Sequence, residues 1–188
     1  GFLCPACRKT GAAMSASVVL AQHDPAFAGI ARKEAKRWQD ACGTALIAFH
    51  HIGSTAIQGL IAKPVLDLMP VFASLSQLDA LRNRICDLGV EWLGEHGLPG
   101  RRLCKRREPA PVQHIHCYAA GDADITRHLA FRDYLNAHPT IAADYARIKE
   151  ACVAQHAGDR HAYGDCKSGW IKATEAKALI WYNKESIE

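Results

Sequence analysis

FHHIGSTAIQGLIAKPVLDLMPV, residues Phe49 to Val71, is the stretch of sequence that decides the predicted fold. An apolar run, Ala45 to Phe49, predicts a strand that continues to about residue 51. The chain then breaks at Gly53-Ser54-Thr55, which predicts a turn. A second apolar run, Val65 to Val71, predicts another strand, and this strand carries a single acid, Asp67. The stretch is therefore predicted as two strands joined by a turn, with one carboxylate on the second strand.

The turn and the acid together suggest a chemical role. A Gly-Ser-Thr turn offers backbone N–H groups and two hydroxyls, and at the start of a short helix over residues 54–59 these would form a cradle for an anion. A carboxylate inside an apolar strand is costly to bury unless a cation lies against it. A phosphate cradle followed by a metal-binding acid is typical of nucleotide chemistry. The alternative, a tight turn before a core strand with one acid at its edge, stays open.

Composition is that of an ordinary globular protein. The chain has 188 residues, 49% of them hydrophobic and 22% charged, which fits one domain. No apolar run approaches the roughly 20 residues that a membrane span needs. The net charge of +4 permits an anionic ligand. Eight cysteines without a secretory signal predict a cytoplasmic protein whose thiols are mostly free.

The first 13 residues are predicted as a leader that is either disordered or artificial, with Met14 as the natural start. Cys4 and Cys7 have the spacing of half a zinc knuckle, but no second Cys-x-x-Cys follows. We therefore expect no structural zinc there.

Periodicity and turn signals predict an α+β fold. Strands are expected at 18–20, 45–51, 65–71, 90–93, 101–107 and 112–118, and helices at 24–42, 54–59, 74–88, 122–137, 139–156 and 168–183, with a loop at 158–164. The basic strand Arg101 to Arg107 is expected to be solvated, with Leu103 facing inward. Because the strands come before the last three helices, residues 14–188 are predicted as one domain, with a mixed sheet over 14–120 and a helical part over 121–188.

Three stretches resemble one family. GSTAIQGLIAKPVLDL, residues 53–68, is similar to the signature of the GrpB-like family, which belongs to the nucleotidyltransferase superfamily of the DNA polymerase beta type. VVLAQHDPAF, residues 18–27, and FRDYLNAHP, residues 131–139, are similar to two further motifs of that family. Tyr145, Lys149, Tyr163 and Lys167 follow at family-like positions, so the resemblance covers about residues 18 to 182. It implies a nucleotidyltransferase-type mixed sheet with helices on its faces.

The resemblance also implies a divalent metal, magnesium or manganese, with zinc as a further option. Metal-dependent members of the superfamily carry two acids two residues apart on one strand and a third on a nearby strand. Here Asp67 is present, but Met69 stands at the second position, and a thioether does not hold magnesium. His114 and His116 share one face of the next predicted strand, and with Asp67 they would form a set of two imidazoles and one carboxylate. Hydrogen bonding of both histidines to phosphate is the open alternative.

Site residues are assigned on this basis. Asp67 and His116 are predicted as catalytic, and Asp67, His114 and His116 as metal ligands. Phosphate or nucleotide binding is assigned to Gly53, Ser54, Thr55, Lys63, Arg132 and Lys167. Each has an alternative role: helix capping for Ser54 and Thr55, a solvated loop position for Lys63, and surface ion pairing for Arg132 with Asp133 and for Lys167 with Asp165.

Two functions follow from the resemblance. The first is a metal-dependent nucleotidyltransferase that acts on a nucleoside triphosphate and a small acceptor. The alternative is a protein of the same fold that binds a nucleotide or another phosphorylated metabolite without turnover, which Met69 favours. Nucleic acid is not an expected partner, because RRLCKRR, residues 101–107, has no interleaved aromatic side chains.

Overall fold

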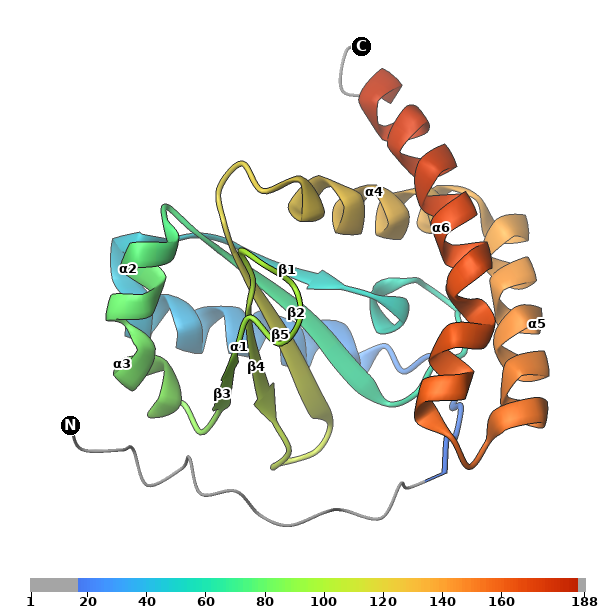
Figure 1. Ribbon diagram of the computed structural model, residues 1–188, viewed down its shortest axis with the longest axis horizontal. Coiled ribbons are helices and arrows are strands. Elements are labelled where there is room, and N and C mark those ends of the chain that lie inside the picture. Colours follow the sequence, from blue (N-terminus) through green and yellow to red (C-terminus); the bar gives the residue numbers. More distant parts are fainter. Residues whose placement is uncertain (1–16, 186–188) are drawn as a thin grey trace.

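One five-stranded mixed sheet organises the computed structural model, which describes residues 17–185 (Figure 1). Its strands are β1 (Leu46–Ile52), β2 (Val65–Phe72), β3 (Glu91–Gly94), β4 (Arg102–Arg106) and β5 (Val112–Ala119). The spatial order is β1-β2-β5-β4-β3. Neighbouring strands are antiparallel except for the central pair, β2 and β5, which is parallel. The predicted α+β class is confirmed.

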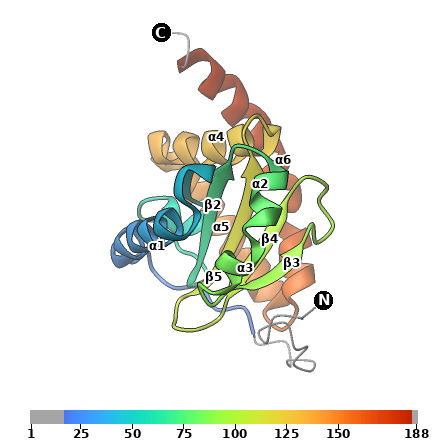
Figure 2. The ribbon, with the colours of Figure 1, turned by 90° about the vertical axis from the view of Figure 1, so that its left-hand side faces the viewer.

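Helices lie before, within and after the sheet in sequence. They are α1 (Ala26–Cys42), α2 (Leu75–Ala80), α3 (Arg82–Cys86), α4 (Ala123–Ala137), α5 (Pro139–His156) and α6 (Arg160–Glu185), with short 3-10 turns η2 (Gly43–Ala45) and η3 (Ser54–Ala56). Figures 1 and 2 show α2 and α3 at one end of the molecule and α5 and α6 at the other. None of the described helices is long and apolar enough to cross a membrane.

Alternation along the central strands separates two faces of the sheet. Leu66 and Leu68 of β2 and Ile115 of β5 are fully buried in the main core, which they share with Trp38 of α1. Each such side chain contributes about 1.5–3 kcal/mol through its burial. On the opposite face, Met69, Tyr118 and Ile52 are buried against Ile125 and Leu129 of α4. Each face of the sheet therefore packs against an apolar cluster.

Three elements predicted in the first half of the chain differ from the structure. Residues 18–20 form no strand; instead Ala21 bridges to Ala62, and the Val18 N–H donates to the Ala157 carbonyl at 2.6 Å. The helix predicted at 54–59 is only the three-residue turn η3. The helix predicted at 74–88 is broken at Leu81 into α2 and α3. At residues 18–21, backbone contacts with distant segments thus replace the expected strand, whereas at Leu81 the N–H still bonds to carbonyls of α2, its own helix.

The loop predicted at 158–164 is wrong, because α6 already begins at Arg160. Asp159 Oδ1 accepts from the N–H groups of His161 and Ala162, which caps the first turn. Tyr163 is buried and holds that turn against α5. Capping and packing outweigh the roughly 1 kcal/mol that Gly164 costs inside a helix.

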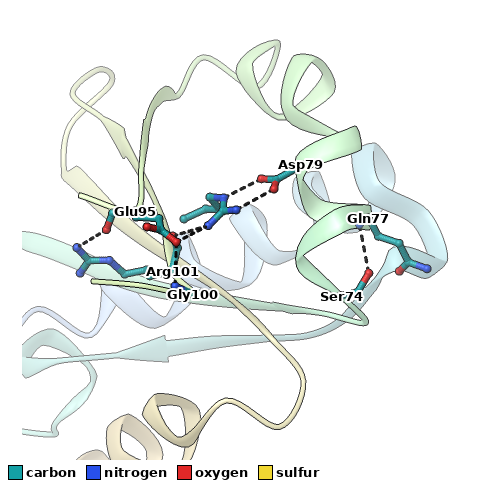
Figure 3. A network of polar contacts seen from close by, with 7 residues as sticks. Ser74, Gln77, Asp79, Glu95, Gly100 and Arg101 are labelled. Atoms are coloured by element: carbon teal, nitrogen blue, oxygen red, sulfur yellow. Dashed lines mark hydrogen bonds and ion pairs between the residues drawn. The ribbon is translucent and has the colours of Figure 1, made fainter. Parts of the chain in front are cut away.

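α2 is held to the sheet by charge. Figure 3 shows Asp79 of α2 accepting two hydrogen bonds, which Arg102 of β4 donates at 2.7 and 2.8 Å. Arg102 also lies 3.5 Å from Glu95, which is the first residue of the β3–β4 connection. Arg101 donates to the Glu95 and His96 carbonyls, so the same connection is fixed twice.

The basic strand is less solvated than expected. Within Arg101 to Arg107 the buried residues are Arg101, Cys104 and Arg106, not Leu103. Arg106 donates to Glu34 of α1 at 2.5 Å, and both side chains are almost wholly buried. A carboxylate from α1 thus makes the burial of this arginine possible. The predicted leader, with Cys4 and Cys7, lies outside the described residues.

Candidate functional site

A carboxylate and two imidazoles meet on the two central strands. Asp67 of β2 stands opposite His114 of β5 in the parallel register. Its Oδ1 lies 3.6 Å from Nδ1 of His114 and 3.5 Å from Nε2 of His116. Leu66 and Ile115 point to the other face of the sheet, so strict alternation places the polar side chains together. The structure therefore brings the three residues together, as the sequence predicted.

Gly53 makes room for Asp67. Its φ is +68°, and a Cβ built there would lie 2.5 Å from Asp67 Oδ2. A side chain at this position would meet both backbone strain and a collision with the carboxylate. Gly53 therefore acts through its backbone, by letting the turn approach β2.

Asp67 is an ionised carboxylate in this setting. Burial by itself would raise its pKa, but the hydrogen bonds of His114 and His116 hold the pKa well below its usual range. The side chain is 31% exposed, so one side of it remains open to the cavity described next.

A cavity of about 160 Å³ opens beside Asp67. This cavity, here called the inner pocket, is lined by Ser54, Ala62, Lys63, Val65, Asp67, His114, Lys149, Tyr163 and Lys167. Its three lysines come from the segment before β2, from α5 and from α6. The ammonium groups of Lys63 and Lys167 lie 5.4 and 5.3 Å from the centre of the Tyr163 ring. Three cations and one carboxylate give the inner pocket an excess of positive charge.

Lys149 is the most enclosed of these cations. It is only 2% exposed, its Nζ donates to the Ile61 carbonyl at 2.8 Å, and it lies 4.5 Å from the centre of the Tyr145 ring. Burial, with the charges of Lys167 and Lys63, lowers its pKa to about 7, although Asp67 acts in the opposite direction. Within the described residues, none of the three lysines forms an ion pair with a carboxylate.

The Gly-Ser-Thr turn is only partly in the site. Ser54 lines the inner pocket. Thr55, assigned to phosphate, is instead 2% exposed, with its Oγ1 2.9 Å from His51 Nε2 and donating to the Val65 carbonyl at 3.3 Å. Because η3 has three residues, the turn is also not the N-terminus of a true helix. The expected cradle is therefore corrected: cationic side chains, not helix N–H groups, provide the positive charge.

Arg132 does not reach the inner pocket. Its guanidinium donates to both carboxylate oxygens of Asp133, at 2.7 and 3.1 Å, and to the His51 carbonyl at 3.0 Å. These contacts match the ion-pair alternative for Arg132. Lys63 and Lys167, by contrast, both line the inner pocket.

Met69 stands at the position where metal-dependent members of the superfamily carry a second acid. It is fully buried between β1, β5 and α4. No group of three or more His, Cys, Asp or Glu side chains in residues 17–185 is arranged to hold a metal ion. Nδ1 of His114 and Nε2 of His116 both face the same oxygen, Oδ1 of Asp67. Nδ1 of His116 is buried without a hydrogen bond among the described groups.

Sequence reasoning assigned no role to Lys149 and Tyr163, although both stood at positions of the family resemblance. The signal that could have found Lys149 is its spacing on α5. It lies one turn from Tyr145 and from Cys152, both of which are buried, so it belongs to the inward face of the helix. A lysine is rarely found on a buried helical face, so this position indicates a specific polar partner or an anionic ligand.

The mixed sheet, with a carboxylate on a central strand beside a Gly-Ser turn and a helical part after the sheet, defines a protein of the nucleotidyltransferase-like fold. More specifically, residues 17–177 match the family described as "GrpB protein". The chain belongs to this GrpB family.

Similar proteins agree with that assignment. The crystal structure of "conserved protein GrpB from Enterococcus faecalis" superimposes with a TM-score of 0.81 at 31% identity, over 87% of this chain and 99% of that one. "UPF0157 protein YqkA" from Bacillus subtilis (strain 168) is 38% identical over 149 residues, 79% of this chain but only 43% of YqkA. A "Dephospho-CoA kinase" from Mycobacterium leprae (strain TN) is 25% identical over 197 residues, 90% of this chain and 48% of that protein. The chain thus spans less than half the length of YqkA and of the dephospho-CoA kinase.

Proposed function

We propose that the inner pocket binds the phosphate groups of a nucleotide and that the protein transfers the nucleotidyl group to a small acceptor. The observation that carries the proposal is the set of three lysines, Lys63, Lys149 and Lys167, around one cavity beside Asp67. A nearly buried ammonium group without a carboxylate partner is costly, and a phosphate would offset that cost through charge-assisted hydrogen bonds. Ser54 adds a hydroxyl to the same wall.

The relatives support a nucleotide over other anions. The nucleotidyltransferase-like fold is named for proteins that bind nucleotides and transfer nucleotidyl groups. In addition, proteins named dephospho-CoA kinase contain a stretch similar to this chain. The name of those proteins concerns phosphoryl chemistry on a nucleotide-containing compound. For this chain that link supports the proposed ligand class.

A divalent ion belongs to the proposal as a partner of the triphosphate. Asp67, His114 and His116 would supply its protein ligands, and imidazole nitrogen suits manganese or zinc better than magnesium. Since no group of three such donors in residues 17–185 is arranged to hold a metal ion, binding an ion would require these side chains to move. When bound, such an ion would neutralise phosphate charge and activate the attacking oxygen. The lysines bind and orient the phosphates, and Asp67 holds a negative charge beside them.

A second candidate is binding without turnover. For both candidates the proposed location is the cytoplasm. Met69 favours binding without turnover, because this fully buried thioether stands where metal-dependent members of the superfamily carry a second acid, and it offers no oxygen ligand. Both candidates use the same inner pocket and the same lysines. They differ only in whether pyrophosphate is released.

The experiment is calorimetry with a panel of nucleoside triphosphates and inorganic triphosphate, with and without manganese. We expect Lys167→Gln to weaken triphosphate binding at least about tenfold, since a hydrogen bond to a charged group contributes roughly 1.5–3 kcal/mol. Lys36→Gln is the matched control, because Lys36 is 77% exposed on α1 and paired with Asp40. Equal binding by Lys167→Gln and the wild type would contradict the proposal. Pyrophosphate release in the presence of an acceptor would separate the enzyme from the binding protein.

A further inference from the structure

A second cavity adjoins the inner pocket. It measures about 420 Å³ and shares Lys63, Val65 and His114 with the inner pocket. This outer pocket adds the cationic side chains of Lys105, Arg107 and Arg160 and the carboxylate of Glu108. Its size exceeds that of the inner pocket, so it can take an organic group that the inner pocket cannot.

Charge in the outer pocket is predominantly positive. Arg107 lies 3.6 Å from Glu91 but is 63% exposed, so this surface pair leaves it free to approach a ligand. Lys105 is more enclosed: its burial, followed by the charges of Arg107, Arg160 and Lys63, lowers its pKa. Cations that repel one another in this way would be stabilised together by one anion between them.

Apolar residues line the rest of the outer pocket. Val18, Val19, Pro64, Val65 and Val112 all contribute to its wall. Val19 is 63% exposed, although a large aliphatic side chain would gain from being covered. The wall therefore suits the carbon skeleton of a ligand, with the cations at one side for its charge.

We propose that the outer pocket binds a second phosphate-bearing organic group, so that one phosphate lies in each of the two connected pockets. This inference rests on the proposed function, because it assumes a phosphate in the inner pocket. Lys63 lines both cavities and contacts either group. The second phosphate belongs either to the same ligand or to the acceptor.

Calorimetry with adenosine 5′-monophosphate and adenosine 3′,5′-bisphosphate tests the first source. We expect the bisphosphate to bind about tenfold more tightly than the monophosphate, as one added charge-assisted contact provides. The double variant Lys105→Gln/Arg107→Gln should lose that gain while binding the monophosphate within about twofold of the wild type. Lys167→Gln should weaken both ligands. Lys36→Gln again controls for the loss of surface charge.

Ribose 5-phosphate, added to protein saturated with inorganic pyrophosphate, tests the second source. Binding alongside pyrophosphate that the double variant abolishes would assign the outer phosphate to a separate acceptor. The inference is overturned if neither the bisphosphate gain nor this second binding event occurs while pyrophosphate still binds. Failure of pyrophosphate and of both adenosine phosphates to bind would overturn the proposed function as well, so the two failures are distinct.

Discussion

Cys152 of α5 and Cys166 of α6 form a disulfide, and each cysteine lies beside a lysine of the inner pocket. Lys149 is three residues before Cys152, and Lys167 directly follows Cys166. The cross-link therefore joins the two helices that carry these cations. Four other described cysteines, Cys42, Cys86, Cys104 and Cys117, are buried and form no disulfide. Among the described residues, the Cys152–Cys166 pair is therefore the exception to the prediction of mostly free thiols.

Removal of the disulfide should destabilise the protein and loosen the inner pocket. The cysteines are 14 residues apart, and closing a loop of that length stabilises a protein by about 3 kcal/mol in the chain-entropy account. We expect Cys152→Ser/Cys166→Ser to unfold at a lower urea concentration than the oxidised wild type and to bind triphosphate more weakly. A reducing agent should lower the wild-type midpoint and leave that of the variant unchanged. An unchanged wild-type midpoint after complete reduction would contradict this role.

Anion affinity should fall as the pH rises through the titration of Lys149. Its pKa of about 7 in the folded protein means that the ammonium group is largely neutral at pH 9, when it no longer attracts an anion. Inorganic sulfate is the suitable probe, because its own charge is constant between pH 6 and pH 9. We expect weaker sulfate binding at pH 9 than at pH 6, and a smaller difference in Lys149→Met. An identical pH dependence in both proteins would exclude Lys149 as the titrating group.

The same shift has a consequence for stability. The pKa of a lysine is about 10.4 in the unfolded chain. Between pH 7 and that value the unfolded state binds more protons at Lys149, so the free energy of unfolding should increase with pH. Lys149→Met should show less of this increase in urea titrations at pH 7 and pH 9. A larger increase in the variant would contradict the direction of the shift.

Glu34 should be needed mainly as the partner of Arg106. The two side chains are 7% and 6% exposed, so Glu34→Gln leaves a buried guanidinium without its full counter-charge. Breaking a buried pair in this way costs about 3–5 kcal/mol. The double variant Glu34→Leu/Arg106→Met removes both charges and should recover most of the loss in urea unfolding. A double variant less stable than Glu34→Gln would show that the pair stabilises the fold beyond mutual compensation.

Gly53→Ala should displace Asp67, whereas Gly59→Ala should not. Both glycines have positive φ, +68° and +74°, so both substitutions carry the same kind of backbone strain. A Cβ at residue 59 meets nothing within 4 Å, but one at residue 53 collides with the Asp67 carboxylate. We expect a larger loss of stability, and a loss of triphosphate affinity, only for Gly53→Ala. Equal effects of the two substitutions would reduce the role of Gly53 to backbone conformation alone.

The central strands and their polar side chains could be predicted because both depend on local alternation. Asp67 interrupts one apolar run, and His114 and His116 share a face of another, so pairing of the two strands sufficed to bring them together. The start of α6 could not be predicted, because Gly158 and Gly164 signal a loop while Asp159 capping and the burial of Tyr163 favour a helix. That error left both Tyr163 and Lys167 outside the predicted helix, whereas both lie on α6.

The directions of the Thr55 and Arg132 side chains could not be predicted from the sequence either. Thr55 points to His51 and Val65, and Arg132 to Asp133, because partners from other elements compete for their polar atoms. Lys149 shows the converse. Its spacing on α5 indicates an inward face, but the packing of α5 against the segment before β2 is what encloses its ammonium group at the Ile61 carbonyl. Local patterns thus located the acid, while tertiary packing determined which cations surround it.

A crystal structure with inorganic pyrophosphate tests the central claim most directly. The account predicts pyrophosphate in the inner pocket, with its oxygens within hydrogen-bonding distance of the ammonium groups of Lys149 and Lys167 and of the Ser54 hydroxyl. A pyrophosphate bound elsewhere, or an empty inner pocket in crystals of protein shown to be saturated in solution, would contradict it.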